Sequence, residues 1–181
     1  MKRLAILVSA GVFIVAVAVA VLAQQPSGPP KPGPEHQKLA YFVGKWTSEG
    51  EAKPSEFGPG GKFSAVDRCD WFDGHFAVIC HSEGKFGEDT FKGLSVMSYD
   101  TAEKTYMYFE TNSAGENVFS RGSVAGDTWT WNNTSMMNGK PVRARFTLKQ
   151  ASADSATYKF EMATGDGPLT MAMEGKQTRQ K

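Results

Sequence analysis

The feature that most constrains this chain is a succession of short alternating runs, bounded by turn-forming residues, from residue 43 almost to the C-terminus. In residues 142–149, for example, apolar side chains occupy the even positions and polar side chains occupy the odd positions. A period of two is typical of strands that bury one face. We expect ten strands, at residues 43–51, 62–71, 75–82, 90–99, 104–111, 116–124, 127–134, 141–150, 156–163 and 169–176.

The spacing of these runs favours an all-β fold, an antiparallel up-and-down barrel, because closure removes the exposed edges that an open sheet would leave. A two-sheet sandwich is the alternative. No segment after residue 42 has a sustained 3.6-residue apolar period, so we expect little helix. A short helical turn at residues 35–41 is expected before the first strand, with Leu39 and Phe42 closing one end of the barrel.

The N-terminus has the features of a secretory signal peptide at residues 1–23. Lys2 and Arg3 precede an apolar stretch, and Ala23 supplies the small residue that signal peptidase favours. An uncleaved membrane anchor is the alternative, because the stretch approaches the roughly 20 residues that span a bilayer. Residues 24–34 are Pro-rich and predict a disordered, extended tether. Residues 35–181 form the expected domain, in a periplasmic or secreted protein without stable membrane insertion after cleavage.

The charge of the mature chain argues against nucleic acid as a partner. Two of the 20 Lys and Arg residues lie in the expected signal peptide, which leaves 18 basic against 19 acidic residues. A chain with mixed charges near neutrality lacks the basic field that attracts nucleic acid or anionic lipid. The sequence leaves the oligomeric state open.

The two cysteines, Cys69 and Cys80, flank the turn signal Asp73-Gly74. A two-residue turn there would place Cys69 opposite Val78, so that the cysteines become diagonal neighbours on one face. Diagonal neighbours lie farther apart than a relaxed disulfide prefers, so a bond would require a bulge or a change in the turn. A disulfide in an oxidising compartment and two buried thiols both fit the sequence.

Neither catalytic residues nor a metal site can be assigned. Glu110, Asp127 and Glu161 fall on expected strands without a nearby histidine or second carboxylate, so no acid–base pair can be named. The sequence has no Gly-x-Ser-x-Gly, phosphate-binding loop or Cys-x-x-Cys pair. An enzyme would instead need a polar cluster with shifted acid–base behaviour inside the barrel.

Large apolar side chains on the alternating faces are candidates for the lining of a ligand cavity. They are Trp129, Trp131, Phe146, Phe160, Met171 and Met173. Aromatic and thioether side chains suit an apolar ligand, but the same residues can simply fill the barrel. On the same alternation, Arg143 and Arg145 point outward.

Several short patterns, taken in order, resemble the bacterial family called domain of unknown function 1579. They are His36-x-x-Leu39 leading to Gly44-x-Trp46, Gly74-His75-Phe76, Phe91-x-Gly93-Leu94 running to Tyr99-Asp100 and Tyr106, Gly139-Lys140-Pro141-Val142, and a terminal Arg179. The resemblance covers residues 36–179. It implies a lipocalin-like barrel of the calycin superfamily, and the family supplies no established activity.

The resemblance also implies roles for three residues. In lipocalins the Gly-x-Trp of the first strand packs at the closed end under a late arginine, which implies a structural role for Gly44 and Trp46 with Arg179, or alternatively Lys176, over the indole. Related nitrobindin-like barrels hold haem through a C-terminal histidine. The histidines here are His36, His75 and His81, so haem by that route is not expected, and we expect no cofactor.

Two functions are favoured after these exclusions, and a third, an enzyme of isomerase or hydrolase type as some calycin barrels are, stays open. The first is a secreted or periplasmic protein that binds a small apolar or amphipathic molecule inside the barrel. The alternative is a non-catalytic envelope protein with a filled barrel that serves a structural or interaction role. A cavity of at least about 300 Å³ would favour the first.

Overall fold

The computed structural model describes residues 29–56, 58–137 and 139–181. The expected signal peptide and the first part of the tether lie outside these residues. Pro32–Lys181 form one unit, which contains every helix and strand described below. No helix in the described ranges is both long and apolar enough to cross a membrane.

The unit is a closed antiparallel barrel in which each strand pairs with its neighbour in sequence and β1 pairs with β10. This confirms the prediction of a ten-stranded up-and-down barrel over the sandwich. A short helical segment, α2 (Pro34–Lys38) followed by η1 (Leu39–Phe42), precedes it as expected. The strands are β1 (Gly44–Ala52), β2 (Gly61–Trp71), β3 (Ala77–Phe86), β4 (Asp89–Asp100), β5 (Thr105–Asn112), β6 (Asn117–Ala125), β7 (Thr128–Met137), β8 (Lys140–Ser152), β9 (Ser155–Thr164) and β10 (Thr170–Gln180).

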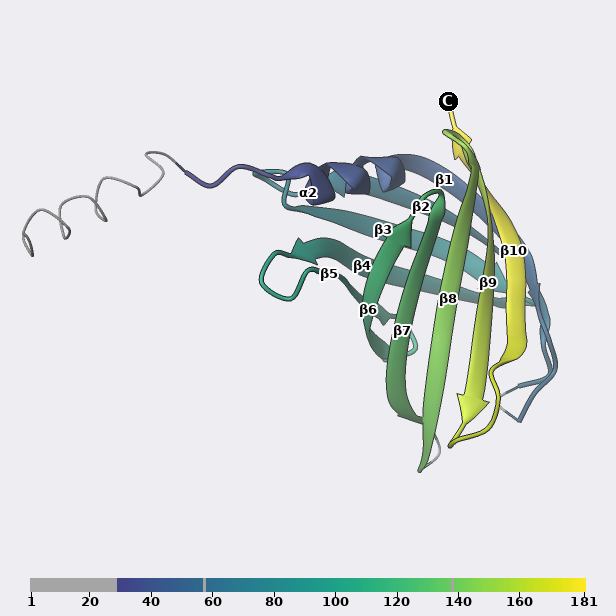
Figure 1. Ribbon diagram of the computed structural model, residues 1–181. Helices are drawn as coiled ribbons and strands as arrows, with labels where there is room; N and C mark the ends of the chain where they lie inside the picture. Colours follow the sequence, from purple (N-terminus) through teal and green to yellow (C-terminus); the bar gives the residue numbers. More distant parts are fainter. Residues whose placement is uncertain (1–28, 57, 138) are drawn as a thin grey trace, which may run out of the picture. The chain divides into compact units, whose positions relative to one another are not determined.

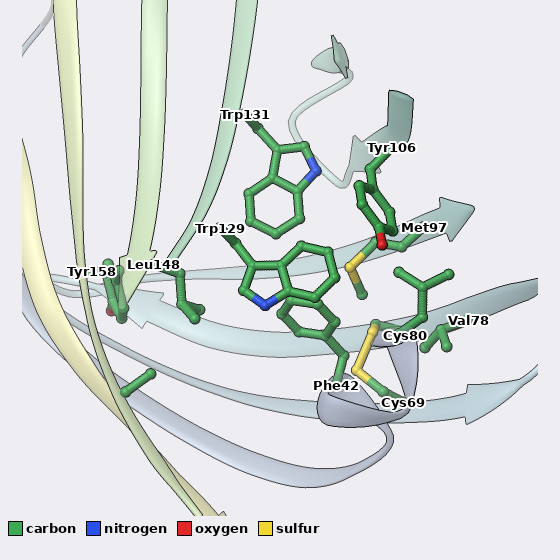
Figure 2. Close-up of a cluster of buried hydrophobic side chains, with 12 residues drawn as sticks. Phe42, Cys69, Val78, Cys80, Met97, Tyr106, Trp129, Trp131, Leu148 and Tyr158 are labelled. Atoms are coloured by element: carbon green, nitrogen blue, oxygen red, sulfur yellow. A yellow bond between two sulfur atoms is a disulfide. The ribbon is translucent and has the colours of Figure 1, made fainter. Parts of the chain in front are cut away.

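The helical segment closes one end of the barrel, and the C-terminal ends of β7 and β9 lie at the opposite end (Figure 1). Leu39 and Phe42 of η1 are buried. The ring of Phe42 meets Trp129 edge-on, with 5.0 Å between centroids, and Figure 2 shows these two side chains together beside the disulfide. The hydroxyl of Tyr106 ties α2 to β5 by donating to the carboxylate of Glu35 at 2.7 Å. We call this helical segment, residues 34–42, the plug.

Next to the plug, Arg179 of β10 clasps the start of β1. Its guanidinium carbon lies 4.3 Å from the ring centre of Trp46, and its nitrogens donate to the carbonyls of Val43 and Tyr41. Gly44 has a φ of 118°, and a Cβ at this position would lie 2.8 Å from a guanidinium nitrogen. Both the backbone and the arginine therefore require glycine here. Lys176, the alternative partner of Trp46, is 2.8 Å from Glu49 instead.

The β2–β3 hairpin differs from the predicted two-residue turn. Cys69 pairs with Cys80 directly, and the two are joined by a disulfide with 4.0 Å between their Cα atoms. The last backbone pair, Phe72 with Ala77, leaves a four-residue loop. This loop contains His75, at a φ of 60°, and Phe76, whose ring packs on His36 at 5.1 Å. Phe76 packs on His36 of the plug and does not continue the strand pairing. The loop is therefore two residues longer than predicted, and the register of the β2–β3 hairpin differs accordingly.

Arg179→Ala is expected to lower the free energy of unfolding by about 2–4 kcal/mol, because it removes a cation–π contact and several charge-assisted hydrogen bonds. Urea unfolding of wild type, Arg179→Ala and Arg179→Lys measures this loss, and the lysine variant should recover only part of it, since it lacks the forked guanidinium. Lys176→Ala, on the same strand, is the control and should stay within about 0.5 kcal/mol of wild type. An Arg179→Ala protein as stable as this control would contradict the clasp.

Candidate ligand cavity inside the barrel

A cavity of about 520 Å³ occupies the barrel interior beyond the plug. Phe42 and Trp46 form its floor on the side of the plug. Its wall also includes Glu116, which is exposed and lies in the turn between β5 and β6, at the other end. The cavity therefore reaches the surface at the end opposite the plug. Its volume lies within the range of about 300–1,000 Å³ that is usual for small-molecule sites.

Four of the six predicted lining residues lie in the cavity wall: Trp131, Phe146, Phe160 and Met173. Trp129 is 1% exposed but lies outside the wall, in the core beneath the plug, where it stacks on Trp131 at 5.5 Å between centroids. The prediction for Met171 is wrong, since this side chain is 37% exposed. The β9–β10 register shifts between Met171 and Met173, so Met171 pairs with Glu161 while Met173 pairs with Phe160. The irregularity at Ala172 breaks the alternation that the prediction assumed.

One side of the cavity is lined mainly by large apolar side chains of the last four strands. We call this side the apolar wall; it consists of Trp131, Ala144, Phe146, Leu148, Tyr158, Phe160 and Met173. Its rings contact one another, with Phe146 lying 5.5 Å from Tyr158 and 6.1 Å from Trp131 between centroids. This surface suits a flat or branched apolar body.

The first six strands place polar side chains at the middle of the same cavity. We call this set the polar belt; it consists of Ser48, Asp67, Ser82, Ser95, Tyr108, Glu110 and Ser120. The strand register pairs Asp67 with Ser82, Ser95 with Glu110 and Tyr108 with Ser120, so the belt is continuous across neighbouring strands. The carboxylate of Asp67 accepts hydrogen bonds from Ser82 at 2.5 Å and Ser48 at 3.4 Å, and the hydroxyl of Tyr108 donates to Glu110.

The two carboxyl groups of the belt have perturbed acidity. Burial raises the pKa of Asp67, and the two serine hydrogen bonds oppose this effect. Burial also raises the pKa of Glu110, the donation from Tyr108 opposes the rise, and the charge of Asp67 adds to it. Burial and then the negative charge of Glu110 hold the pKa of Tyr108 well above its usual range. Among the described residues that line the cavity, none is Lys, Arg or His.

Glu110 was predicted to lie on a strand without a second carboxylate nearby. That was wrong, because Asp67, more than forty residues earlier, lines the same cavity. A signal was present in the alternation: Asp67 lies two residues before Cys69 and Ser82 lies two residues after Cys80, so both share the inward face of the cysteines. Proximity in sequence does not reveal that residues on β2 and β5 line the same cavity.

The histidines lie away from the cavity. The ring of His36 is buried in the plug and its Nδ1 accepts the backbone N–H of Gly33 at 3.2 Å, while His75 and His81 are exposed. Within the described residues, no group of three or more His, Cys, Asp or Glu side chains is arranged to hold a metal ion.

The double variant Asp67→Asn, Glu110→Gln is expected to be more stable than wild type at neutral pH. Because the folded-state pKa values of both carboxyls are raised, their contribution to stability is full below the unfolded-state values of about 4 and is lost as the pH rises through the raised values. Urea unfolding should therefore show a gain near pH ~8 that disappears below pH ~4. Glu51→Gln, Asp70→Asn, which neutralises two exposed carboxylates, is the control and should show no such pH-dependent gain. Equal stability of the belt variant and wild type at both pH values would contradict the assignment.

Comparisons with known proteins place this barrel among others of the same fold. The chain is similar to the crystal structure of Rv2717c from M. tuberculosis, at 13% sequence identity and a TM-score of 0.57, over 82% of this chain and 99% of that chain. It is also similar to the S-type phycobiliprotein lyase CPES from Guillardia theta, at 12% identity and a TM-score of 0.54, over 81% of this chain and 93% of that chain. Identities this low show a shared fold alone. No curated protein matches the sequence.

The family model described as a protein of unknown function, DUF1579, matches residues 31–179. This span includes the plug, β1 to β9 and β10 as far as Arg179. It agrees with the resemblance seen in the motifs from His36 to Arg179, and the lipocalin-like barrel agrees with the fold that the resemblance implied. Because the match covers most of the sequence, the chain belongs to the DUF1579 family.

Proposed function

We propose that this protein binds a small apolar or amphipathic molecule inside the barrel. The observation that carries the proposal is the cavity of about 520 Å³, which reaches the surface at the end opposite the plug. A barrel whose interior were merely a folding core would be filled by its side chains. Here the cavity wall offers both aromatic rings and hydrogen-bonding groups, a combination suited to an amphipathic ligand.

We also propose that the protein works in the periplasm or outside the cell. The signal-peptide features of residues 1–23 support this compartment, and so does the Cys69–Cys80 disulfide, since such bonds persist in oxidising environments. N-terminal sequencing of the exported protein tests the proposal: a first residue of Gln24 is expected, and a retained Met1 in the exported protein would count against cleavage.

A second candidate function is proton-transfer catalysis. Asp67, Tyr108 and Glu110 form the polar cluster with shifted acid–base behaviour that an enzyme in this barrel would need. One barrel of the same fold carries the name of a lyase. However, Glu110 is engaged by Tyr108 and Asp67 by two serines, so no free base is in place beside a free acid. The alternative of a filled structural barrel conflicts with the size of the cavity.

The proposal predicts that a neutral apolar dye, N-phenyl-1-naphthylamine, binds to the wild-type protein with an increase in fluorescence. Ala144 is buried in the apolar wall, so Ala144→Leu and Ala144→Trp should weaken binding stepwise, by at least about tenfold for the larger side chain, because they occupy the space that the dye requires. Ala151→Trp, at an exposed position on the same strand, is the matched control and should bind like wild type.

Circular dichroism and thermal unfolding confirm that each variant is folded before its affinity is compared. The leucine variant keeps the test informative if tryptophan disrupts the barrel. No binding to wild type, or equal binding to wild type and a folded Ala144 variant, would contradict a ligand inside the barrel. Recovery of the dye unchanged after long incubation with wild type would separate binding from catalysis on this probe.

A further inference from the structure

We propose that the cavity selects ligands that carry a protonated amine on an apolar body, with the amine at the polar belt and the body against the apolar wall. This inference rests on the proposed function, because it specifies the chemistry of a ligand for the same cavity. It follows from the distribution of charge, hydrogen-bond acceptors and aromatic rings around the interior.

The charged side chains that the structure describes in the cavity wall are all acidic. Asp67, Glu110 and Glu116 line the cavity, and among its described lining residues no basic side chain balances them. The nearest basic residues in sequence, Arg68 and His81, are exposed on the opposite face of β2 and β3. An anionic ligand would therefore meet carboxylates and no opposite charge among these residues, whereas an ammonium group would neutralise buried charge.

A buried hydrogen-bond acceptor without a partner lies in the cavity wall. The amide oxygen of Asn133 in the wall is buried and has no hydrogen-bond partner. It requires a donor, as do the remaining lone pairs of the two carboxylates. A primary ammonium group supplies three donors and no acceptor, so it fits this set better than a hydroxyl group does. The unpartnered indole N–H of Trp131 and the unpartnered hydroxyl of Tyr158 lie in the same wall and can donate to an acceptor on the ligand body.

A tyrosine lies close to each of the two buried carboxylates, Tyr108 to Glu110 and Tyr158 to Asp67. Glu110 accepts a hydrogen bond from Tyr108 on its own strand, and its acidity responds to the charges of Asp67 and Glu116, which line the same cavity. Asp67 is bordered by Ser48 and Ser82 on the neighbouring strands, and Tyr158 lies close enough for its acidity to respond to the charge of Asp67. An ammonium group here would lie beside carboxylates, which attract cations, and beside tyrosine hydroxyls, which can accept its hydrogen bonds.

The test uses three probes of nearly equal shape: 1-naphthylmethylamine, 1-naphthylmethanol and 1-naphthoate. Their affinities for the wild-type chain are measured by calorimetry or by quenching of tryptophan fluorescence near pH ~7.5, where the amine is protonated. The amine should bind at least about tenfold more tightly than the alcohol, since one charge-assisted hydrogen bond in a buried site has about this effect. The carboxylate should bind most weakly.

Asp67→Asn, Glu110→Gln should remove the preference for the amine, bringing its affinity to within about threefold of the alcohol, while binding of the alcohol stays the same. The matched control Glu51→Gln, Asp70→Asn makes the same change in net charge on the outer surface and should keep the full preference. This control separates a local contact from the long-range attraction of a more acidic protein.

The possible outcomes separate the two proposals. If all three probes bind equally well, or if the belt variant keeps the amine preference, the cation selectivity is wrong while the binding function stands. If the carboxylate binds most tightly, the inference is overturned outright. If no probe binds and N-phenyl-1-naphthylamine also fails to bind, the proposed function fails first.

Discussion

The interior of this protein depends on the closure of the barrel where its first strand meets its last. β1 and β10 pair from Lys45 with Gln180 to Ala52 with Met173, and Arg179 holds this seam by covering Trp46 and binding the carbonyls that precede Gly44. Without this seam the sheet would have two open edges and its inward side chains would have no common centre. The Gly-x-Trp step and the late arginine, separated by most of the chain, thus form one structural unit.

The closed sheet gives each strand an inward face, and those faces differ between the two halves of the chain. Strands β7–β10 contribute mainly rings and aliphatic groups, whereas β1–β6 contribute serines, a tyrosine and two carboxylates together with apolar side chains such as Phe63, Phe91 and Met97. Buried carboxylates oppose folding when ionised. Their presence beside an open cavity therefore fits a site that is completed by a bound cation better than it fits a folding core.

Most of the fold was predictable because alternation and turn residues report local geometry. The inward positions of Trp131, Phe146, Phe160 and Met173 followed from this period of two. The prediction failed where the backbone departs from this period. Met171 points outward beside an irregularity at Ala172. In the β2–β3 hairpin, Phe76 packs on His36 and the register places Cys69 opposite Cys80. The polar belt was not predicted for another reason. Asp67 on β2 and Glu110 on β5 line the same cavity only because the sheet curls into a barrel.

The central claim is that the barrel holds a ligand between the apolar wall and the polar belt. A crystal structure of the protein with 1-naphthylmethylamine tests it most directly. We predict density for the naphthyl ring against Trp131 and Phe146, with the ammonium nitrogen within hydrogen-bonding distance of Asp67 or Glu110. An interior that is filled by rearranged side chains, with the amine bound only on the outer surface, would contradict the account.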